Sequence, residues 1–270
     1  MQQVYLTLAA IVRDQEHYIK EWLAFHYLTG FERFVIVLHK CNDTTEERIR
    51  ELPFQEKIHI HRVVNDEQYV QLGTYLWILN NYGQATRWMT FLDSDEFLFG
   101  TKENDLKRLL TDYEAYGGVL SHWLLFGSNN HAVRPQGLSI EAFAKRAPDN
   151  DWNHYSFKML IQPQYFQKFL SPHLAKTVAP TVREHFDIAD SRWIWRGDKS
   201  PTWDVFRINH YHTRSMEDWV ARYKRGQCND PYPCYHYGSE AFKSHDYNNV
   251  NDACILRFAK PLKLLLETEL

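Results

Sequence analysis

The 270-residue sequence has little cysteine, and the cysteines it has do not form a metal-binding pattern. Four are present: Cys41, Cys228, Cys234 and Cys254. No two of them are spaced as Cys-x-x-Cys, which argues against a zinc knuckle. Cys228 and Cys234 flank the segment NDPYP and could approach each other in a loop. We nevertheless expect free thiols in a reducing compartment.

An excess of basic residues is also absent. Lys and Arg number 31 against 34 Asp and Glu, which gives a formal net charge of -3. This balance argues against a generally basic nucleic-acid-binding protein, and no nucleic-acid partner is expected. An anionic ligand would therefore need a local basic patch or a bound cation.

Long apolar runs are missing too. No stretch approaches the roughly 20 apolar residues that span a bilayer, and the opening MQQVYLTLAAIVRDQ lacks the features of a signal peptide. We expect a soluble, cytoplasmic chain, with an anchor outside this sequence as an open alternative. The tail over residues 255–270 is expected to be a packed terminal helix. The alternative is a peripheral contact between this helix and the inner face of the membrane.

The residues that are present have an ordinary globular composition, with 44% hydrophobic and 24% charged residues. The length allows one large α/β domain or two small ones. No internal repeat or clear linker divides the chain, so we expect a single domain over residues 1–270. Regular patterns fill roughly the first 130 residues, whereas the remainder, with its interleaved Pro, Trp and His, is expected to be irregular.

Apolar runs alternate with helical patterns through residue 92. Strands are expected over residues 4–12, 34–38, 58–64 and 88–92, and helices over residues 16–28, 44–52 and 68–82. A helix near residues 104–112 and a strand near 118–126 follow. This order predicts a Rossmann-like, mostly parallel sheet flanked by helices on both faces.

Two of these helices carry more specific expectations. Asp43 followed by Glu46 resembles a capping box that opens the second helix. The third helix carries three leucines on one side: Leu72, Leu76 and Leu79.

The strongest chemical signal is the sequence Asp93-Ser94-Asp95-Glu96, directly after the apolar strand WMTFL. In an open α/β sheet, ligands bind beyond the carboxyl ends of the strands. Acids crowded there repel one another, and a divalent cation such as Mg²⁺ or Mn²⁺ relieves the repulsion. Such a cation would stabilise charge on a departing diphosphate. An Asp-x-Asp pattern is weak by itself, because acids also cluster in solvated turns; the preceding strand and β/α series strengthen it.

A second signal lies far along the chain in RINHYH, residues 207–212. A neutral imidazole is a good metal ligand, so His210 or His212 could close a site begun by the acids. The alternative is a hydrogen-bonded core histidine. Arg214, Lys224 and Arg225 follow closely, and Arg suits the binding of phosphate oxygens, although each could equally be a solvated surface charge.

Taken in order, the motifs resemble those of glycosyltransferase family 92 and its bacterial relatives, which adopt the GT-A fold. The segments that carry this resemblance are RDQEHYIKEWLAFHYLTG, KCNDTTEE, Gln71 to Leu76, FLDSDEFLF, HWLLFGSNN, RINHYHTRSMEDWVARYKRG and FKSHDYNNVNDACI. Two departures leave the donor sugar open: RDQE replaces the family's usual opening triplet, and Arg214 replaces its usual lysine.

The resemblance implies an inverting transfer of a sugar, often galactose from UDP-galactose, onto a carbohydrate acceptor, with Mn²⁺ as the usual metal. It implies that residues 1–130 bind the nucleotide-sugar and that residues 131–270 bind the acceptor and complete the metal site. The implied metal ligands are Asp93, Asp95 and His210, with His210 preferred to His212. The implied nucleotide-sugar-binding residues are Asp43, Gln71, Asp93, Ser94 and Arg214.

An inverting enzyme also needs a base that deprotonates the acceptor hydroxyl. The candidates are Glu184, Asp187, Asp198 and Asp204, which lie near three tryptophans that could form an acceptor platform, Trp193, Trp195 and Trp203. Trp and Tyr suit sugar ligands because each combines an apolar ring with a polar group.

Two other function classes stay open. An apolar strand that ends in Asp-x-Asp also begins phosphohydrolases of the HAD type, in which the first Asp becomes phosphorylated. Those enzymes place the motif on the first strand, whereas three predicted strands precede Asp93 here. The other alternative is a module that binds a sugar or nucleotide without turnover.

Overall fold

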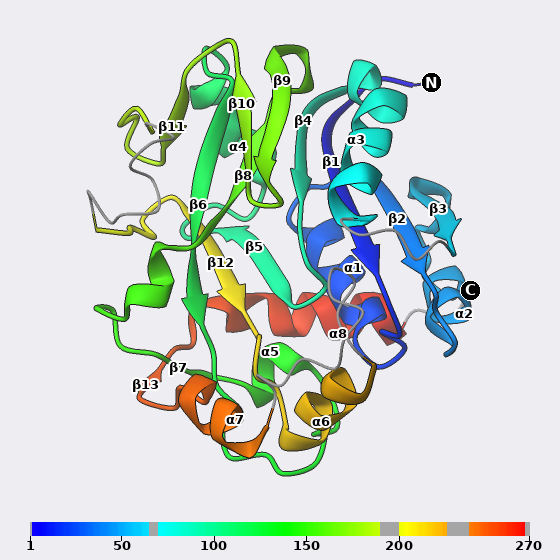
Figure 1. The fold of residues 1–270 in the computed structure, drawn as a ribbon, viewed down its shortest axis with the longest axis vertical. Coiled ribbons are helices and arrows are strands. Elements are labelled where there is room, and N and C mark those ends of the chain that lie inside the picture. Colours follow the sequence, from blue (N-terminus) through cyan, green and yellow to red (C-terminus); the bar gives the residue numbers. More distant parts are fainter. Residues whose placement is uncertain (1, 65–69, 190–199, 226–237, 268–270) are drawn as a thin grey trace.

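A curled, mostly parallel sheet runs through the middle of the molecule, with helices packed on both of its faces (Figure 1). The computed structural model describes residues 2–64, 70–189, 200–225 and 238–267. The α/β class predicted from the sequence is confirmed. None of the helices within the described residues is long and apolar enough to cross a membrane.

The strands are β1 (Val4–Val12), β2 (Arg33–His39), β3 (Ile58–Val63), β4 (Thr86–Phe91), β5 (Glu96–Gly100), β6 (Gly118–Leu125), β7 (Lys145–Arg146), β8 (Phe157–Ile161), β9 (Phe166–Ser171), β10 (Leu174–Thr177), β11 (Thr181–Arg183), β12 (Phe206–His210) and β13 (Val250–Asn251). The α-helices are α1 (Ile19–Leu28), α2 (Thr45–Arg50), α3 (Val70–Tyr82), α4 (Leu106–Leu110), α5 (Ser139–Ala142), α6 (Met216–Arg225), α7 (Ser239–His245) and α8 (Ala259–Glu267). Short 3₁₀ helices are η1 (Gln55–Lys57), η2 (Gly83–Ala85), η3 (Thr111–Tyr113), η4 (Trp152–Tyr155), η5 (Pro163–Tyr165) and η8 (Cys254–Phe258).

The main sheet has the strand order β3-β2-β1-β4-β8-β6-β12-β5, and β11 pairs with β6. Strands β1, β2, β3 and β4 are parallel neighbours, as are β6 and β12. The exceptions are β8, antiparallel to β4 and β6, and β5, antiparallel to β12. Strands β4 and β6 therefore run in the same direction, and the carboxyl ends of β1, β4 and β12 lie along one edge of the sheet.

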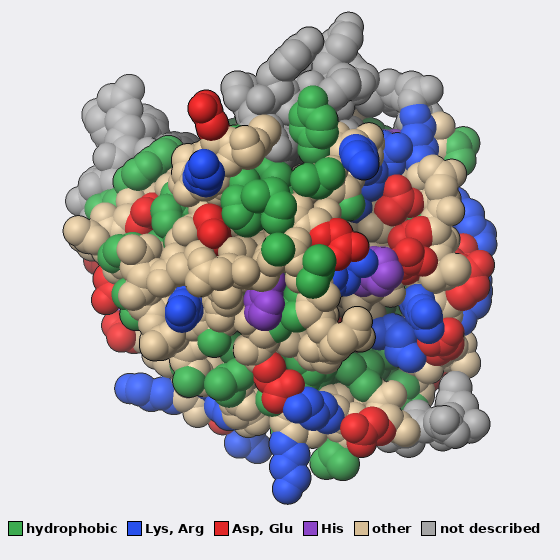
Figure 2. Space-filling view, turned by 90° about the horizontal axis from the view of Figure 1, so that it is seen from below, with side chains coloured by type: hydrophobic (Ala, Val, Ile, Leu, Met, Phe, Trp, Pro, Cys, Tyr) green, Lys and Arg blue, Asp and Glu red, His purple; other side chains and the backbone are tan. Residues whose placement is uncertain are grey.

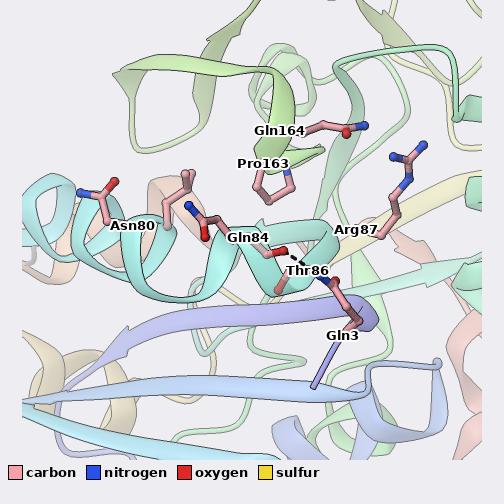
Figure 3. Close-up of a pocket in the computed structure, with 9 residues that line it drawn as sticks. Gln3, Asn80, Gln84, Thr86, Arg87, Pro163 and Gln164 are labelled. Carbon is pink, nitrogen blue, oxygen red and sulfur yellow. Dashed lines mark hydrogen bonds between the residues drawn. The ribbon is translucent and has the colours of Figure 1, made fainter. Parts of the chain in front are cut away.

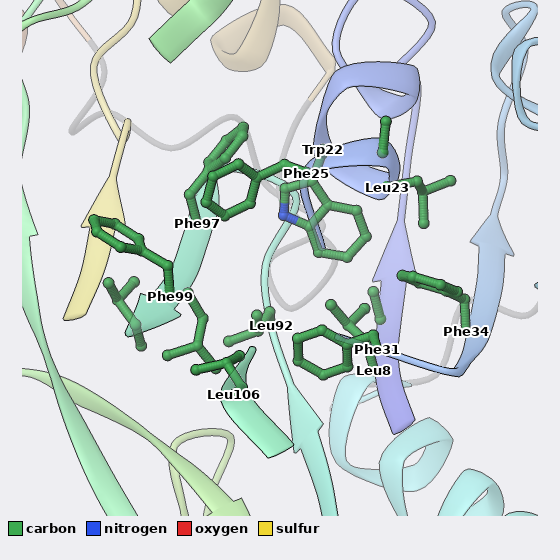
Figure 4. Packing of buried hydrophobic residues seen from close by; sticks show 14 of the residues in the cluster. Leu8, Trp22, Leu23, Phe25, Phe31, Phe34, Leu92, Phe97, Phe99 and Leu106 are labelled. Carbon is green, nitrogen blue, oxygen red and sulfur yellow. The ribbon is translucent and has the colours of Figure 1, made fainter. Parts of the chain in front are cut away.

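The continuous apolar run of β1 is explained by burial of both sheet faces, as is typical of parallel strands. Leu6, Leu8 and Ala10 pack into the core cluster beneath α1, whereas Ala9 and Ile11 pack into the cluster beneath α3. In the first cluster, aromatic side chains from α1 and β5 meet aliphatic ones from β1, from α4 and from Leu92, which follows β4 (Figure 4).

Helix α1 fastens the segment that follows β4. The indole Nε1 of Trp22 donates to the carbonyl of Glu96 at 2.8 Å, and the backbone N–H of Leu98 donates to His26 Nε2 at 3.2 Å. His26 is fully buried, and burial lowers its pKa to about 3, so the ring stays neutral and can accept this bond. These contacts hold the Asp93–Glu96 turn against a rigid helix.

The strands and helices predicted through residue 126 are present, with ends shifted by up to three residues. Two details differ. Of the three leucines placed on one side of α3, Leu79 is buried but Leu76 is 44% exposed, and most of the buried face is formed by other residues, Gln71, Tyr75 and Ile78 among them. The capping box does not form: Glu46 pairs with Arg50 and Arg62 instead.

The second half is more regular than predicted. Strands β8 and β12 are interior strands of the main sheet, and β5 follows the acidic turn immediately. These strands are short, and β5 and β12 pair across more than 100 residues of chain, which local periodicity cannot indicate. Helix α8 packs on α1 with Leu262 fully buried, as the packed-helix interpretation predicts; Leu264 is exposed.

Candidate metal centre

Polar side chains gather where β1, β4 and β12 end. Figure 2 shows the molecule from below the view of Figure 1, toward the edge of the sheet where these strands end. Histidine side chains lie there among acidic and basic ones. The pairing of β5 with β12 explains the convergence. Glu96 lies opposite His210 in this ladder, and the backbone N–H of Tyr211 donates to the carbonyl of Asp95 at 2.8 Å. Two segments that are far apart in sequence are thereby held in register.

Three potential metal ligands meet at this place. Asp95, His210 and His212 each offer a ligand atom, and these atoms lie within 4.8 Å of one another. Asp95 Oδ1 is 3.5 Å from His210 Nε2. The residues predicted to approach each other, Asp95 and His210, do so, and His212 joins them.

The protonation states suit a cation. Burial would raise the pKa of the Asp95 carboxyl, but the nearby His210 and Arg222 outweigh burial and hold that pKa well below its usual range. Burial, reinforced by Arg222, holds the pKa of His212 well below 6.5. The group therefore offers a carboxylate and, at His212, a neutral imidazole.

The residues also fit a metal by their chemistry. His210 Nδ1 is buried and has no hydrogen-bond partner among the residues that the structure describes. Two imidazoles and one carboxylate suit a transition metal such as Mn²⁺, whereas Mg²⁺ prefers oxygen ligands.

Asp93 is not part of this group. Its Oδ2 accepts from Lys158 Nζ at 2.9 Å, and its Oδ1 accepts from Gln71 Nε2 at 3.3 Å. Lys158 also lies 3.4 Å from Glu96, and the side chains of Lys158 and Glu96 are 1% and 0% exposed. The structure thus brings Gln71 to Asp93, as expected of two donor-site residues, but turns Asp93 toward a lysine.

Asp93, Glu96 and Lys158 form a second cluster, in which the lysine lies between the two acids. Burial raises the pKa of Glu96 well above its usual value, although Lys158 opposes the shift. Burial lowers the pKa of Lys158, but Asp93 and Glu96 outweigh it, so the net shift is upward and Lys158 is a fixed ammonium. A fixed positive charge beside Asp93 keeps that carboxyl group oriented.

Four arginines surround the same edge: Arg13, Arg214, Arg222 and Arg225. Burial lowers the pKa of Arg225, and the positive charges of the other three add to this effect, although Asp14 opposes it. The Nε atoms of Arg13, Arg214 and Arg225 are buried and lack a hydrogen-bond partner within the described ranges. Mutually repelling guanidiniums with unused donors are the environment that an anion stabilises.

Arg214 has a defined position among them. Its Nη2 donates to the carbonyl of Ser94 at 2.9 Å, its Nη1 donates to Gln15 Oε1 at 3.3 Å, and its guanidinium lies 3.8 Å from the centre of the Tyr18 ring. Arg214 itself has φ of 53°, the left-handed region. Arg214 therefore contacts the segments that follow β1 and β4 from the segment that follows β12, where the donor site is predicted.

Asp43 binds neighbouring loops. Its Oδ2 accepts from the backbone N–H of Glu16, and its Oδ1 accepts from the backbone and hydroxyl of Thr45. It also lies with Asp14 and Cys41 in a second group of potential ligands within 4.8 Å. Asp43 thus joins the β1 and β2 ends, at the same edge as the other predicted donor-site residues.

The base candidates divide clearly. Glu184 is 2% exposed and accepts three backbone N–H groups, from Asp204, Val205 and Phe206, at 2.9 to 3.0 Å. Phe206 begins β12 and the other two residues precede it, whereas His210 ends the strand, so Glu184 lies about 13 Å from His210 along the strand. Its oxygens accept these backbone bonds, which argues against its action as a base.

The other candidates lie in more open positions. Asp204 is exposed, and its Oδ2 lies 2.9 Å from His185 Nε2. Asp187 is half-buried. Asp198, Trp193 and Trp195 lie outside the described residues. Trp203 donates to the carbonyl of Trp123 at 3.0 Å, and the ring of Trp123 lies 4.3 Å from that of His210. Trp123 thus connects Trp203 to His210.

Sequence reasoning missed Lys158 and Arg222. Lys158 lies in the apolar run FKMLI, where a lysine is expected to face solvent. No sequence pattern links it to its partner Asp93, 65 positions earlier. Arg222 lies in α6 among other basic residues. Its Nη2 donates to Asp95 Oδ2 at 2.8 Å, although no spacing in the sequence indicates it.

A separate hollow of about 530 Å³ lies at the opposite edge of the sheet (Figure 3). It is lined by Gln3, Asn80, Gln84, Thr86, Arg87 and others, where β1 and β4 begin. None of the predicted site residues lines it.

Comparison with known proteins places the sequence. The sequence model of glycosyltransferase family 92 matches residues 3–222. The chain belongs to glycosyltransferase family 92. The family 92 resemblance noted in the motifs is confirmed, and the mostly parallel sheet with flanking helices is the GT-A-type arrangement expected of it.

Similar family 92 proteins come from plants. One from Arabidopsis thaliana is 22% identical over 235 residues, which cover 82% of this chain and 40% of that protein. One from Ricinus communis is 22% identical over 221 residues, 82% of this chain and 37% of that protein. A galactan β-1,4-galactosyltransferase of A. thaliana is 28% identical over 106 residues, 36% of this chain and 20% of the relative. The chain thus spans about 40% of the length of the family 92 relatives it matches.

Solved structures show weaker similarity. Staphylococcus aureus TarS, crystallised with UDP, is 13% identical with a TM-score of 0.44, over 76% of this chain and 60% of that one. Glucosyl-3-phosphoglycerate synthase from Mycobacterium tuberculosis, crystallised with Mn²⁺, UDP and phosphoglyceric acid, is 15% identical with a TM-score of 0.31, over 44% of this chain and 43% of that one.

Proposed function

We propose that this family 92 domain is a Mn²⁺-dependent, inverting glycosyltransferase that moves galactose from UDP-galactose onto a carbohydrate acceptor, in the synthesis of a glycan or polysaccharide. The observation that carries the proposal is the meeting of Asp95, His210 and His212 within 4.8 Å at the ligand-binding edge of the sheet. The name of the A. thaliana galactan galactosyltransferase supports galactose as the sugar.

In this proposal each part of the edge has a role. Asp95, His210 and His212 hold the metal, which when bound would neutralise charge on the departing diphosphate. Arg214, with its neighbouring arginines, binds phosphate oxygens. Gln71 and Asp93, kept in place by Lys158, bind the donor ribose or sugar, while Asp43 and Ser94 lie toward the nucleoside.

The base that activates the acceptor is assigned to a region of the chain and not to one residue. Asp187 and Asp204 remain the described candidates for the base, because Glu184 has its oxygens occupied by backbone amides; Asp204 lies beside Glu184 at the start of β12, so it would meet an acceptor at that end of the strand. An acceptor sugar would lie near Trp203 and Trp123, beside His210. We further propose that the protein works in the cytoplasm, and that the exposed side of α8, with Lys260, Lys263 and Leu264, contacts the inner membrane face.

The test is release of UDP from UDP-galactose, measured with Mn²⁺ and with EDTA. We expect release with Mn²⁺ only, and Asp95→Ala should reduce it at least about 100-fold, because its carboxylate is the charged ligand. Asp112→Ala, which removes an exposed acid from η3, before the start of β6 and so at the opposite edge of the sheet, is the control and should keep full activity.

Other outcomes would favour the other classes. Binding of UDP-galactose without release of UDP would favour a non-catalytic module. Trapping of a phosphoaspartate at Asp93 would favour a phosphohydrolase of the HAD type. Full activity of Asp95→Ala would refute the metal assignment.

A further inference from the structure

Arg222 already occupies two of the three proposed metal ligands. From α6, its Nη2 donates to Asp95 Oδ2 at 2.8 Å, and its Nη1 lies 3.2 Å from His212 Nδ1. A guanidinium has donors and no acceptor. His212 Nδ1 must therefore present a lone pair to Arg222, which leaves the ring proton of a neutral His212 on Nε2. In this arrangement His212 has no free lone pair for a metal.

A metal and this guanidinium cannot share the site at low cost. A divalent cation held by Asp95 and His212 would lie a few ångströms from the positive charge of Arg222, and like charges at that distance in a buried site repel strongly. The side chain of Arg222 is 15% exposed, so solvent screens the repulsion only in part. Arg222 has to leave Asp95 when the metal arrives.

The surroundings of Arg222 indicate where it can go. Arg225 repels it, because the positive charges of Arg222 and Arg225 lie close enough in this cluster to disfavour each other. A nucleoside diphosphate at this edge would supply the negative charge that the displaced guanidinium needs. Metal binding without the nucleotide would take from Arg222 its two present partners, Asp95 and His212.

We propose that Arg222 is an internal cation that holds Asp95 and His212 before the metal binds, so that metal and guanidinium compete for these two side chains. The diphosphate of the donor then gives the displaced guanidinium its new partner. Metal and nucleotide therefore bind cooperatively, and part of the coupling between them comes from Arg222. This inference rests on the metal site of the proposed function.

The first test measures Mn²⁺ affinity of the full chain without nucleotide, from the electron paramagnetic resonance signal of free Mn²⁺. Arg222→Gln should bind Mn²⁺ at least about tenfold more tightly than the unmodified chain, because a competing charge is removed. Arg225→Gln is the matched control. It removes the same charge from the same cluster, but Arg225 donates to the Asp14 carbonyl and not to Asp95, so its effect should stay below about threefold.

The second test adds UDP. In the unmodified chain UDP should tighten Mn²⁺ binding by a larger factor than in Arg222→Gln, because only the unmodified chain has a guanidinium to displace. Arg222→Lys keeps a positive charge at this position and should resemble the unmodified chain in its Mn²⁺ affinity. Thermal unfolding of each variant confirms that it is folded.

The outcomes separate this inference from the proposed function. If Asp95→Asn loses Mn²⁺ binding but Arg222→Gln binds no more tightly than Arg225→Gln, competition is refuted and the metal site stands. If Asp95→Asn binds Mn²⁺ as well as the unmodified chain, or if no variant binds it, the metal site is wrong and this inference falls with it.

Discussion

Replacing Lys158 with Met should destabilise the domain strongly. The two side chains have similar volume, so the main loss is the ammonium that lies 2.9 Å from Asp93 and 3.4 Å from Glu96. Removing one partner of a buried ion pair leaves an uncompensated charge, which costs about 3–5 kcal/mol. For a domain of this size that loss lowers the unfolding midpoint by about 6–20 °C.

The pH dependence gives the same prediction a second readout. Lys158 has a raised pKa in the folded protein, so its contribution to stability is complete below its unfolded pKa, near 10.4, and is lost only as pH rises through the folded value. Glu96 also has a raised pKa, so it favours the folded state below its unfolded pKa, near 4.3, and less so as pH rises. Without Lys158 the pKa of Glu96 rises further. The stability difference between the two proteins should therefore grow from pH 4 to pH 7.

Urea unfolding at both pH values measures this difference. Lys20→Met is the control, since Lys20 pairs with Glu51 at 3.0 Å at the surface, where an ion pair is worth less than about 1 kcal/mol. A loss in Lys158→Met that is no larger than in the control, or that does not grow with pH, would refute the account of this cluster.

Two further substitutions test the division of roles. Replacing His210 with Ala should reduce Mn²⁺-dependent UDP release more than replacing His212 with Ala, because His210 approaches Asp95 directly while His212 is paired with Arg222; equal or reversed losses would overturn this order. Glu184→Gln should lower the free energy of unfolding by about 2–3 kcal/mol, because one of its oxygens becomes an amide donor facing backbone N–H groups, yet turnover per folded molecule should stay unchanged. A fall in turnover with unaltered stability would restore Glu184 as a base.

The front half of the fold could be predicted from the sequence because its signals are local. The apolar run of β1 and the period of α1 each report burial within a few residues of the chain. The leucines of α3 gave only part of its buried face: Leu79 lies in the core and Leu76 is exposed, whereas Tyr75, which the leucine pattern does not include, is fully buried.

The candidate site could be predicted only in part, for the same reason. Asp95 and His210 carry recognisable residue types after apolar strands. Their actual meeting depends on the β5–β12 ladder, which joins positions more than 100 residues apart. Strand β8 brings Lys158 to Asp93, and helix α6 brings Arg222 to Asp95. No local sequence pattern indicates either contact.

The metal assignment can be tested at the level of single ligand atoms. Pulsed electron paramagnetic resonance of Mn²⁺ bound to the full chain with UDP detects magnetic coupling to directly ligated nitrogen. We predict coupling from imidazole nitrogen that is weakened in His210→Ala and abolished when His212 is replaced as well. Bound Mn²⁺ that couples to phosphorus and water protons but to no nitrogen would contradict the site formed by Asp95, His210 and His212.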